Sequence, residues 1–188
     1  MRSLFLDRDG VINRRIVDGY VIRPDDFVLI DGVTEAFAIF AHLFDRIFIV
    51  TNQQGIGKGL MSENDLEIIH DKLIKQVADA GGRIDRIYHC PALKADRSFF
   101  RKPSIGMALK ARRDFPEVDL RRSVMVGDTE SDMLFGRRAR MTTVLVGDDT
   151  DLARRKPHLV DFGFPDLISF ARWENENSGT KPALHESI

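Results

Sequence analysis

Short apolar runs alternate with stretches of helical periodicity along most of this chain. The apolar runs lie at residues 3–6, 47–50, 84–89, 123–126 and 142–146. Between them, apolar side chains recur at helical spacing over residues 33–44, 63–80, 103–115 and 130–140. Strands that alternate with helices of this length predict a parallel sheet with helices on both faces, a three-layer Rossmann-like α/β fold.

The segments between these elements are rich in turn-forming residues. Residues 14–31 and 90–101 show no periodicity, and residues 53–60 contain three glycines, so we expect loops there. Pro103 suits the first turn of the helix that it begins. Near the end of the chain we expect a short strand over residues 159–162 and a last helix over residues 165–173.

The length and composition are those of one globular domain. A chain of 188 residues with 43% hydrophobic residues can bury a full core but is short for two domains. We expect one domain over residues 1–173 and a polar, disordered tail over residues 174–188. The formal net charge of −1 argues against binding to nucleic acid or to a membrane surface. The first apolar run is too short for a signal peptide or a membrane span, which favours a cytoplasmic protein.

Polar side chains follow three of the apolar runs, at the points where strands should end. Asp7 and Asp9 follow the first run, Thr51 and Asn52 the second, and Asp128 the fourth. Ligands of parallel sheets bind beyond the carboxyl ends of the strands, so these side chains should meet at one edge. Two carboxylates that point the same way repel each other, which favours a bound divalent cation. A donor set of oxygens without His or Cys favours Mg²⁺.

These residue types suit phosphoryl transfer. We assign Asp7 as the nucleophile that forms an aspartyl-phosphate. Asp9 is the general acid that protonates the leaving oxygen and then, as a base, activates water. Thr51 offers a hydroxyl and a backbone N–H to a phosphoryl oxygen, and Lys102 offers a cation to the charge that develops. Asp128 would complete the Mg²⁺ site.

Each of these residues also has a purely structural interpretation. Asp7 and Asp9 could belong to an ordinary Asp/Gly turn after a strand. Asp128 and Asp132 could cap the start of a helix, although Asp132 lies one helical turn further on and could hold a metal-bound water. Thr51 could simply end a strand, and Lys102 could be a solvated charge. We assign no chemistry to four histidines, which are His42, His70, His158 and His185.

Together the motifs resemble those of the haloacid dehalogenase superfamily, over residues 3–170. The matching stretches are Asp7-Arg8-Asp9-Gly10, Val50-Thr51-Asn52-Gln53, Arg101-Lys102-Pro103, and Gly127-Asp128 with Asp132. Within the superfamily, Gly19-Tyr20-Val21 and Ile87-Tyr88-His89-Cys90-Pro91 resemble the heptose bisphosphate phosphatases of subfamily III. The histidinol-phosphate phosphatases are the next most similar.

The resemblance implies roles for these residues. It implies a phosphohydrolase in which Mg²⁺ contacts Asp7, the backbone carbonyl of Asp9, and Asp128. It implies that Thr51 and Lys102 hold the phosphoryl group. It also implies that six residues face the substrate, which are Gly19, Tyr20, Asn52, Gln53, Gln54 and Arg101.

The chain departs from the subfamily at the loop before Arg101. The subfamily usually carries a zinc loop of three cysteines and a histidine there, whereas Cys90 is the only cysteine of this chain. A single thiol cannot hold structural zinc, so we expect no zinc. The loop must be held in another way, for example by packing of Phe99 and Phe100.

The spacing of the motifs leaves no room for a cap domain. Asp7 to Thr51 accommodates only a loop, a helix and a strand, and Thr51 to Lys102 only a helix, a strand and a loop. The sequence therefore predicts a Mg²⁺-dependent phosphatase of a small phosphorylated metabolite, with a sugar phosphate such as heptose 1,7-bisphosphate as the first candidate. The sequence does not give the oligomeric state, for which we favour a monomer. Two alternatives stay open, a histidinol-phosphate phosphatase and a non-catalytic phospho-acceptor or phosphate-binding module.

Overall fold

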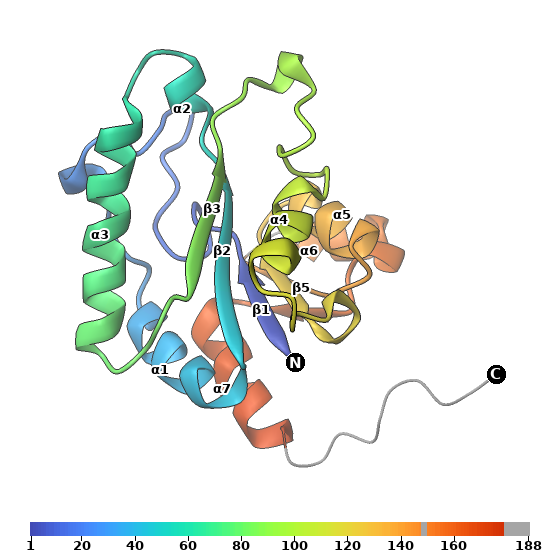
Figure 1. The fold of residues 1–188 in the computed structure, drawn as a ribbon. Helices are drawn as coiled ribbons and strands as arrows, with labels where there is room; N and C mark the ends of the chain where they lie inside the picture. Colours follow the sequence, from blue (N-terminus) through green and yellow to red (C-terminus); the bar gives the residue numbers. More distant parts are fainter. Residues whose placement is uncertain (148–149, 179–188) are drawn as a thin grey trace.

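Parallel strands form the sheet around which the chain is built (Figure 1). The computed structural model describes residues 1–147 and 150–178. Its strands are β1 (Ser3–Leu6), β2 (Arg46–Asn52), β3 (Arg86–Cys90), β4 (Val124–Gly127), β5 (Thr142–Val146) and β6 (Phe162–Phe164). They follow the spatial order β3-β2-β1-β4-β5-β6, and every neighbouring pair is parallel. This order is that of a Rossmann-like sheet and confirms the predicted fold class.

Helices cover both faces of the sheet (Figure 1). They are α1 (Val33–Leu43), α2 (Gln54–Gly57), α3 (Glu63–Asp79), α4 (Gly106–Asp114), α5 (Glu130–Arg138), α6 (Thr150–Arg155) and α7 (Leu167–Asn177). Helices α1, α3 and α7 pack on one face, and α4 and α5 pack on the other. Ser62 caps α3, because its hydroxyl accepts a hydrogen bond from Asp65 N.

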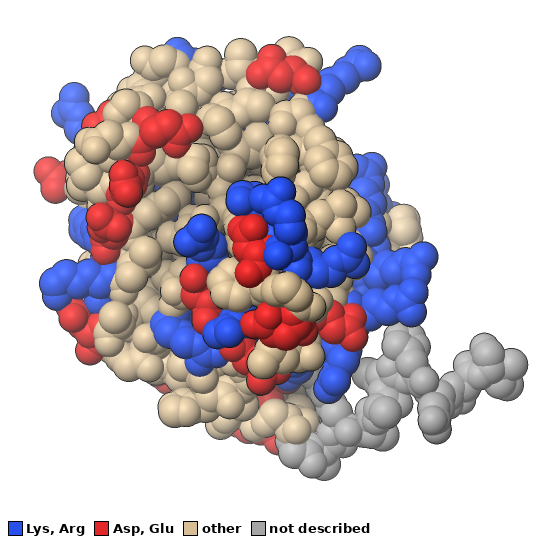
Figure 2. Space-filling view, in the orientation of Figure 1, with Lys and Arg blue, Asp and Glu red and all other residues tan. Residues whose placement is uncertain are grey.

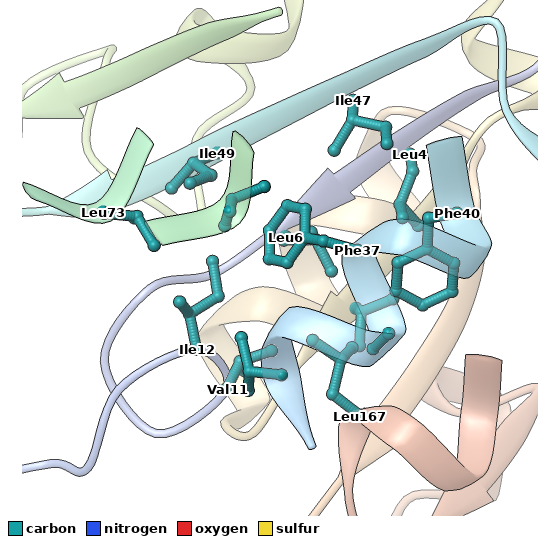
Figure 3. Packing of buried hydrophobic residues seen from close by; sticks show 14 of the residues in the cluster. Leu4, Leu6, Val11, Ile12, Phe37, Phe40, Ile47, Ile49, Leu73 and Leu167 are labelled. Atoms are coloured by element: carbon teal, nitrogen blue, oxygen red, sulfur yellow. The ribbon is translucent and has the colours of Figure 1, made fainter. Parts of the chain in front are cut away.

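The alternation of side chains along β1 divides the core into two layers. Leu4 and Leu6 pack against α1, α3 and α7 (Figure 3). Phe5, which lies between them in the sequence, points to the other face and packs with side chains of α4 and α5. All three side chains are fully buried, and burial of each contributes about 1.5–3 kcal/mol to stability. Strand β1 is thereby fixed near the middle of the sheet, and Asp7 follows directly at its carboxyl end.

The structure differs from two predictions, one for the segment after Thr51 and one for the helix after Lys102. A short helix, α2, occupies residues 54–57, where only a loop was expected, because Lys58 N donates a hydrogen bond to Gln54 O at 3.0 Å. The helix expected from Pro103 begins only at Gly106. The backbone N–H of Gly106 donates to Phe99 O at 3.1 Å, which keeps the preceding residues in a turn.

The last elements of the chain also differ from expectation. The predicted strand at 159–162 is displaced to Phe162–Phe164, because Pro157–Leu159 forms a 3₁₀ turn, and α6 was not predicted at all. Helix α7 runs to Asn177, past the domain boundary expected at residue 173, and Glu174 within it is buried beside Arg2. Residues 179–188 of the expected tail lie outside the described residues.

The segments between the motifs hold no cap domain, as predicted. Residues 7–102, all of which the structure describes, contain only α1, α2, α3, β2, β3 and short 3₁₀ turns. None of the helices in the described part of the chain has the length and apolar character that a membrane span requires. On the face seen in Figure 2, acidic and basic side chains lie interspersed, and no broad area of one sign is visible.

Candidate active site

Side chains from several elements meet at the carboxyl edge of the sheet, as the polar residues after the apolar runs predicted. A cavity of about 520 Å³ opens there. It is lined by predicted residues, namely Asp7, Asp9, Gly19, Tyr20, Thr51, Asn52, Gln53, Gln54, Arg101 and Lys102. It is also lined by residues that the sequence did not point to, which include Arg15, Lys58, Thr129 and Ser131.

Lys102 lies between two carboxylates on the floor of this cavity. Its Nζ is 2.7 Å from Asp7 Oδ1 and 2.6 Å from Asp132 Oδ1, and all three side chains are buried. Burial alone would lower the pKa of Lys102, but the carboxylates of Asp132 and Asp7 outweigh it and raise that pKa. The ammonium therefore stays charged at neutral pH. Asp132 thus holds Lys102 against Asp7, a contact that the sequence did not indicate. Its Oδ2 also accepts from Thr129 N at 3.1 Å, so Asp132 caps the start of α5, as its structural interpretation predicted.

Three carboxylates are close enough to share one cation. Oxygen atoms of Asp7, Asp128 and Asp132 lie within 4.8 Å of one another. Burial raises the pKa of Asp7 to about 6, with Lys102 opposing the rise and Asp132 and Asp9 adding to it. Burial, followed by repulsion from Asp7 and Asp132, raises the pKa of Asp128 to about 8. The cluster is therefore short of positive charge, and its all-oxygen donor set fits a hard divalent cation such as Mg²⁺.

Gly10 allows Asp128 to approach the first motif. Its φ of +96° lies in the left-handed region, which suits glycine, and a Cβ added there would lie 2.0 Å from Asp128 Oδ2. Any side chain at position 10 would push this carboxylate away from Asp7 and Asp9. The glycine of the first motif is therefore required by the site and not only by the turn.

Arg15 contacts two of the atoms that the resemblance assigned to the metal. Its Nη2 donates to the backbone carbonyl of Asp9 at 2.8 Å and to Asp128 Oδ1 at 2.9 Å. The guanidinium supplies positive charge where two oxygens converge. Nothing in the sequence signals this contact, because Arg15 lies in a loop without periodicity.

The carboxylate of Asp9 is held by three side chains. Arg8 Nη2 donates to its two oxygens at 2.9 and 3.0 Å, Asn13 Nδ2 donates at 2.9 Å, and Gln53 Nε2 at 2.8 Å. Burial alone would raise the pKa of Asp9, but the Arg8 guanidinium and these hydrogen bonds outweigh it and lower that pKa. Asp9 is therefore ionised and fixed in orientation before any ligand binds.

The residues that the resemblance placed against the substrate have partners of their own. Asn52 holds the backbone of Lys102, because its Oδ1 accepts from Lys102 N at 3.0 Å and its Nδ2 donates to Lys102 O at 3.2 Å. Gln53 Nε2 donates to the Thr51 hydroxyl at 2.8 Å. Gln54 Nε2 donates to the Tyr20 hydroxyl at 2.8 Å. Asn52 thus also positions Lys102, and Gln53 also positions Thr51.

The loop after β3 is held by hydrogen bonds and not by aromatic packing. The expectation for Phe99 and Phe100 is wrong: their rings contact each other, but the residues are 56% and 44% exposed. Instead, Arg101 Nη1 donates to Ala92 O at 2.9 Å. The Cys90 thiol lies 3.8 Å from the hydroxyl of Ser98, which also accepts from Phe100 N at 3.2 Å.

Comparison with known proteins gives one consistent family. A HAD-hydrolase-like family model matches residues 99–167. The D-glycero-α-D-manno-heptose-1,7-bisphosphate 7-phosphatase of Burkholderia mallei is 42% identical over 81% of this chain and 83% of its own length. The β-anomer enzyme of Vibrio cholerae is 38% identical over 77% of this chain and 80% of its own.

A solved structure extends the likeness to the whole fold. The D,D-heptose 1,7-bisphosphate phosphatase of B. bronchiseptica, in complex with magnesium and phosphate, matches with a TM-score of 0.82 and 31% identity. The match covers 94% of this chain and 99% of that one. Identity at this level over most of both chains extends beyond a shared fold to a shared kind of chemistry. The chain is thus a phosphatase, and it belongs to the heptose bisphosphate phosphatase family of the haloacid dehalogenase superfamily.

Proposed function

We propose that this phosphatase hydrolyses a sugar bisphosphate, heptose 1,7-bisphosphate, through an aspartyl-phosphate on Asp7. The observation that carries the proposal is the contact of Asp7 with Lys102 on the floor of the cavity. A carboxylate held beside a buried ammonium can attack a phosphorus atom while the cation stabilises the charge on the phosphoryl oxygens. The relatives of this chain act on heptose bisphosphate, which supports the choice of substrate.

The reaction has two steps that use the same two carboxylates. Asp7 forms a bond to phosphorus as the bond to the leaving oxygen breaks, and Asp9 donates a proton to that oxygen. Asp9 then takes a proton from the water that attacks the aspartyl-phosphate, which releases phosphate and restores Asp7. Asp9 is ionised in the ligand-free site, and a phosphoryl dianion bound beside it would raise its pKa and let it carry the proton.

Asp7, Asp128 and the backbone carbonyl of Asp9 would hold Mg²⁺, which supplies positive charge beside the phosphoryl oxygens when bound. The close approach of the carboxylates and the raised pKa values of Asp7 and Asp128 support this assignment. Asp132 remains the partner of Lys102. Thr51 offers its hydroxyl to the phosphoryl group.

Two further cations in the cavity support a substrate with a second anionic group. Lys58 and Arg101 both line it, and among the described residues neither forms an ion pair with a carboxylate. Lys58 Nζ lies 5.1 Å from the centre of the Tyr20 ring. A second phosphate would give these cations a partner, which a substrate with one phosphate would not.

A panel of phosphate esters tests the proposal. With Mg²⁺ present, kcat/KM should be highest for heptose 1,7-bisphosphate, lower for histidinol phosphate and for sugar monophosphates, and measurable for p-nitrophenyl phosphate. A higher kcat/KM for histidinol phosphate would identify the other activity. A long-lived phosphorylated Asp7 without turnover would identify a phospho-acceptor module and reject the proposal.

A further inference from the structure

The guanidinium of Arg8 is buried and has few partners. Arg8 is 0% exposed, and among the described residues its Nε has no hydrogen-bond partner. Its Nη2 donates to the carboxylate of Asp9, and its Nη1 lies 3.3 Å from Nε2 of His70. A buried charge is costly unless its donors are satisfied, so the contact with His70 has a consequence for where the guanidinium lies.

His70 can only accept in this contact. All the polar hydrogens of an arginine are donors, so Nε2 of His70 must offer its lone pair, which requires a neutral ring with the proton on Nδ1. His70 lies on the buried side of α3, together with Leu66, Ile69 and Leu73. Burial, followed by repulsion from Arg8 and His89, lowers the pKa of His70 to about 3, which agrees with a neutral ring.

We propose that His70 is a positioning residue for proton transfer: its imidazole accepts from Arg8 and so holds the guanidinium that orients the carboxylate of Asp9. The inference rests on the proposed role of Asp9 as acid and base. Asn13 and Gln53 also hold Asp9, so loss of His70 weakens the orientation without abolishing it. The sequence gives no sign of this role, because His70 lies on a helix 62 residues from Arg8.

The dependence of the rate on the leaving group tests this role. His70→Leu keeps the bulk of the side chain and removes the acceptor, whereas His70→Gln keeps an acceptor oxygen. An alkoxide needs a proton from Asp9 in order to leave, but p-nitrophenolate does not. For the best alkyl phosphate of the panel, His70→Leu should lower kcat/KM about 10-fold, the effect of one lost hydrogen bond to a charged group. It should change kcat/KM for p-nitrophenyl phosphate little, and His70→Gln should restore most of the loss.

His89→Leu is the matched control. The centroid of the His89 ring lies 6.2 Å from that of His70, but among the described residues His89 forms no hydrogen bond with Arg8. This variant should show no dependence on the leaving group. Equal losses on both esters, or no rescue by glutamine, would overturn the role of His70 and leave only a packing role.

A second measurement needs no substitution. ¹⁵N–¹H correlation spectra of the parent protein at neutral pH should show His70 with its proton on Nδ1 and Nε2 free. A protonated Nε2 would overturn the inference even where the variants do not fold. Asp9→Asn separates this inference from the proposed function: if it loses no more activity on the alkyl ester than on the aryl ester, the acid role of Asp9 itself fails, whatever His70 does.

Discussion

The floor and the mouth of the cavity are built in opposite ways. The floor, which we define as Asp7, Lys102 and Asp132, consists of buried charges that contact one another at 2.6 and 2.7 Å. The mouth, formed by residues 14–23 and 90–101, is largely exposed and is held by single hydrogen bonds such as that from Arg101 to Ala92. Chemistry common to a superfamily needs fixed charges, whereas choice among substrates can reside in loops that vary at little cost to the fold.

The largest loss of activity is expected from substitution of Asp7, on the floor of the cavity. Asp7→Asn should lower kcat by about 10³-fold or more, because the amide cannot form the aspartyl-phosphate. Removal of the nucleophile in other enzymes lowers kcat by at least this order of magnitude. The unfolding midpoint should not fall, because burial already favours the uncharged form of this side chain. Near-parental turnover, measured by phosphate release, would mean that another group is the nucleophile.

Removal of the floor cation should damage both activity and stability. Lys102→Met leaves the carboxylates of Asp7 and Asp132 buried without a partner, so kcat/KM should fall about 10²-fold or more. The free energy of unfolding should fall by about 3 kcal/mol, measured by urea denaturation.

Lys110→Met is the control for this substitution, since Lys110 pairs with Asp114 at 3.2 Å on the surface. Its cost should be about 0.5 kcal/mol. If both variants lost the same free energy of unfolding, the buried ion pairs of the floor would contribute no more to stability than an ion pair on the surface.

Substitution in the mouth should affect substrate choice alone. Arg101→Met should raise KM for the sugar bisphosphate about 10-fold, the effect of one lost charged hydrogen bond, and leave kcat/KM for p-nitrophenyl phosphate nearly unchanged. Arg97→Met, in the same loop and exposed, should change neither. If kcat/KM fell equally for both substrates, Arg101 would contribute to the chemical step, like the residues of the floor, and not to substrate choice.

The smallest expected effect is the pH dependence of Mg²⁺ binding. The raised pKa values of Asp7 and Asp128 mean that the metal-free fold gains stability from the protonated forms at low pH and loses it as pH rises through about 6 and about 8. Protons compete with the ion, so Mg²⁺ should raise the unfolding temperature more at pH 9 than at pH 6, by a few degrees. Asp128→Asn should remove the increment, and an equal increment at both pH values would contradict the assignment of the cluster.

The sequence predicts well the side chains that directly follow a strand, because their position depends on the order of the strands. Asp7, Thr51 and Asp128 each follow a buried apolar run, and a parallel sheet brings such positions to one edge. Contacts that depend on single side-chain directions were not predictable. Arg15 reaches Asp128 from a loop without periodicity, and His70 looks like part of an apolar helix face. The start of α4 was misplaced because a backbone hydrogen bond to Phe99, invisible in the pattern, delays the helix.

The hydrogen bonds that hold the loop after β3 have a consequence for how the enzyme responds to its surroundings. A loop built on thiolates and zinc loses its shape when an oxidant or a chelator removes the ion. Here the same segment relies on main-chain and hydroxyl partners, with one buried thiol beside Ser98. The entrance of this enzyme should therefore keep its form through oxidative stress and zinc starvation alike.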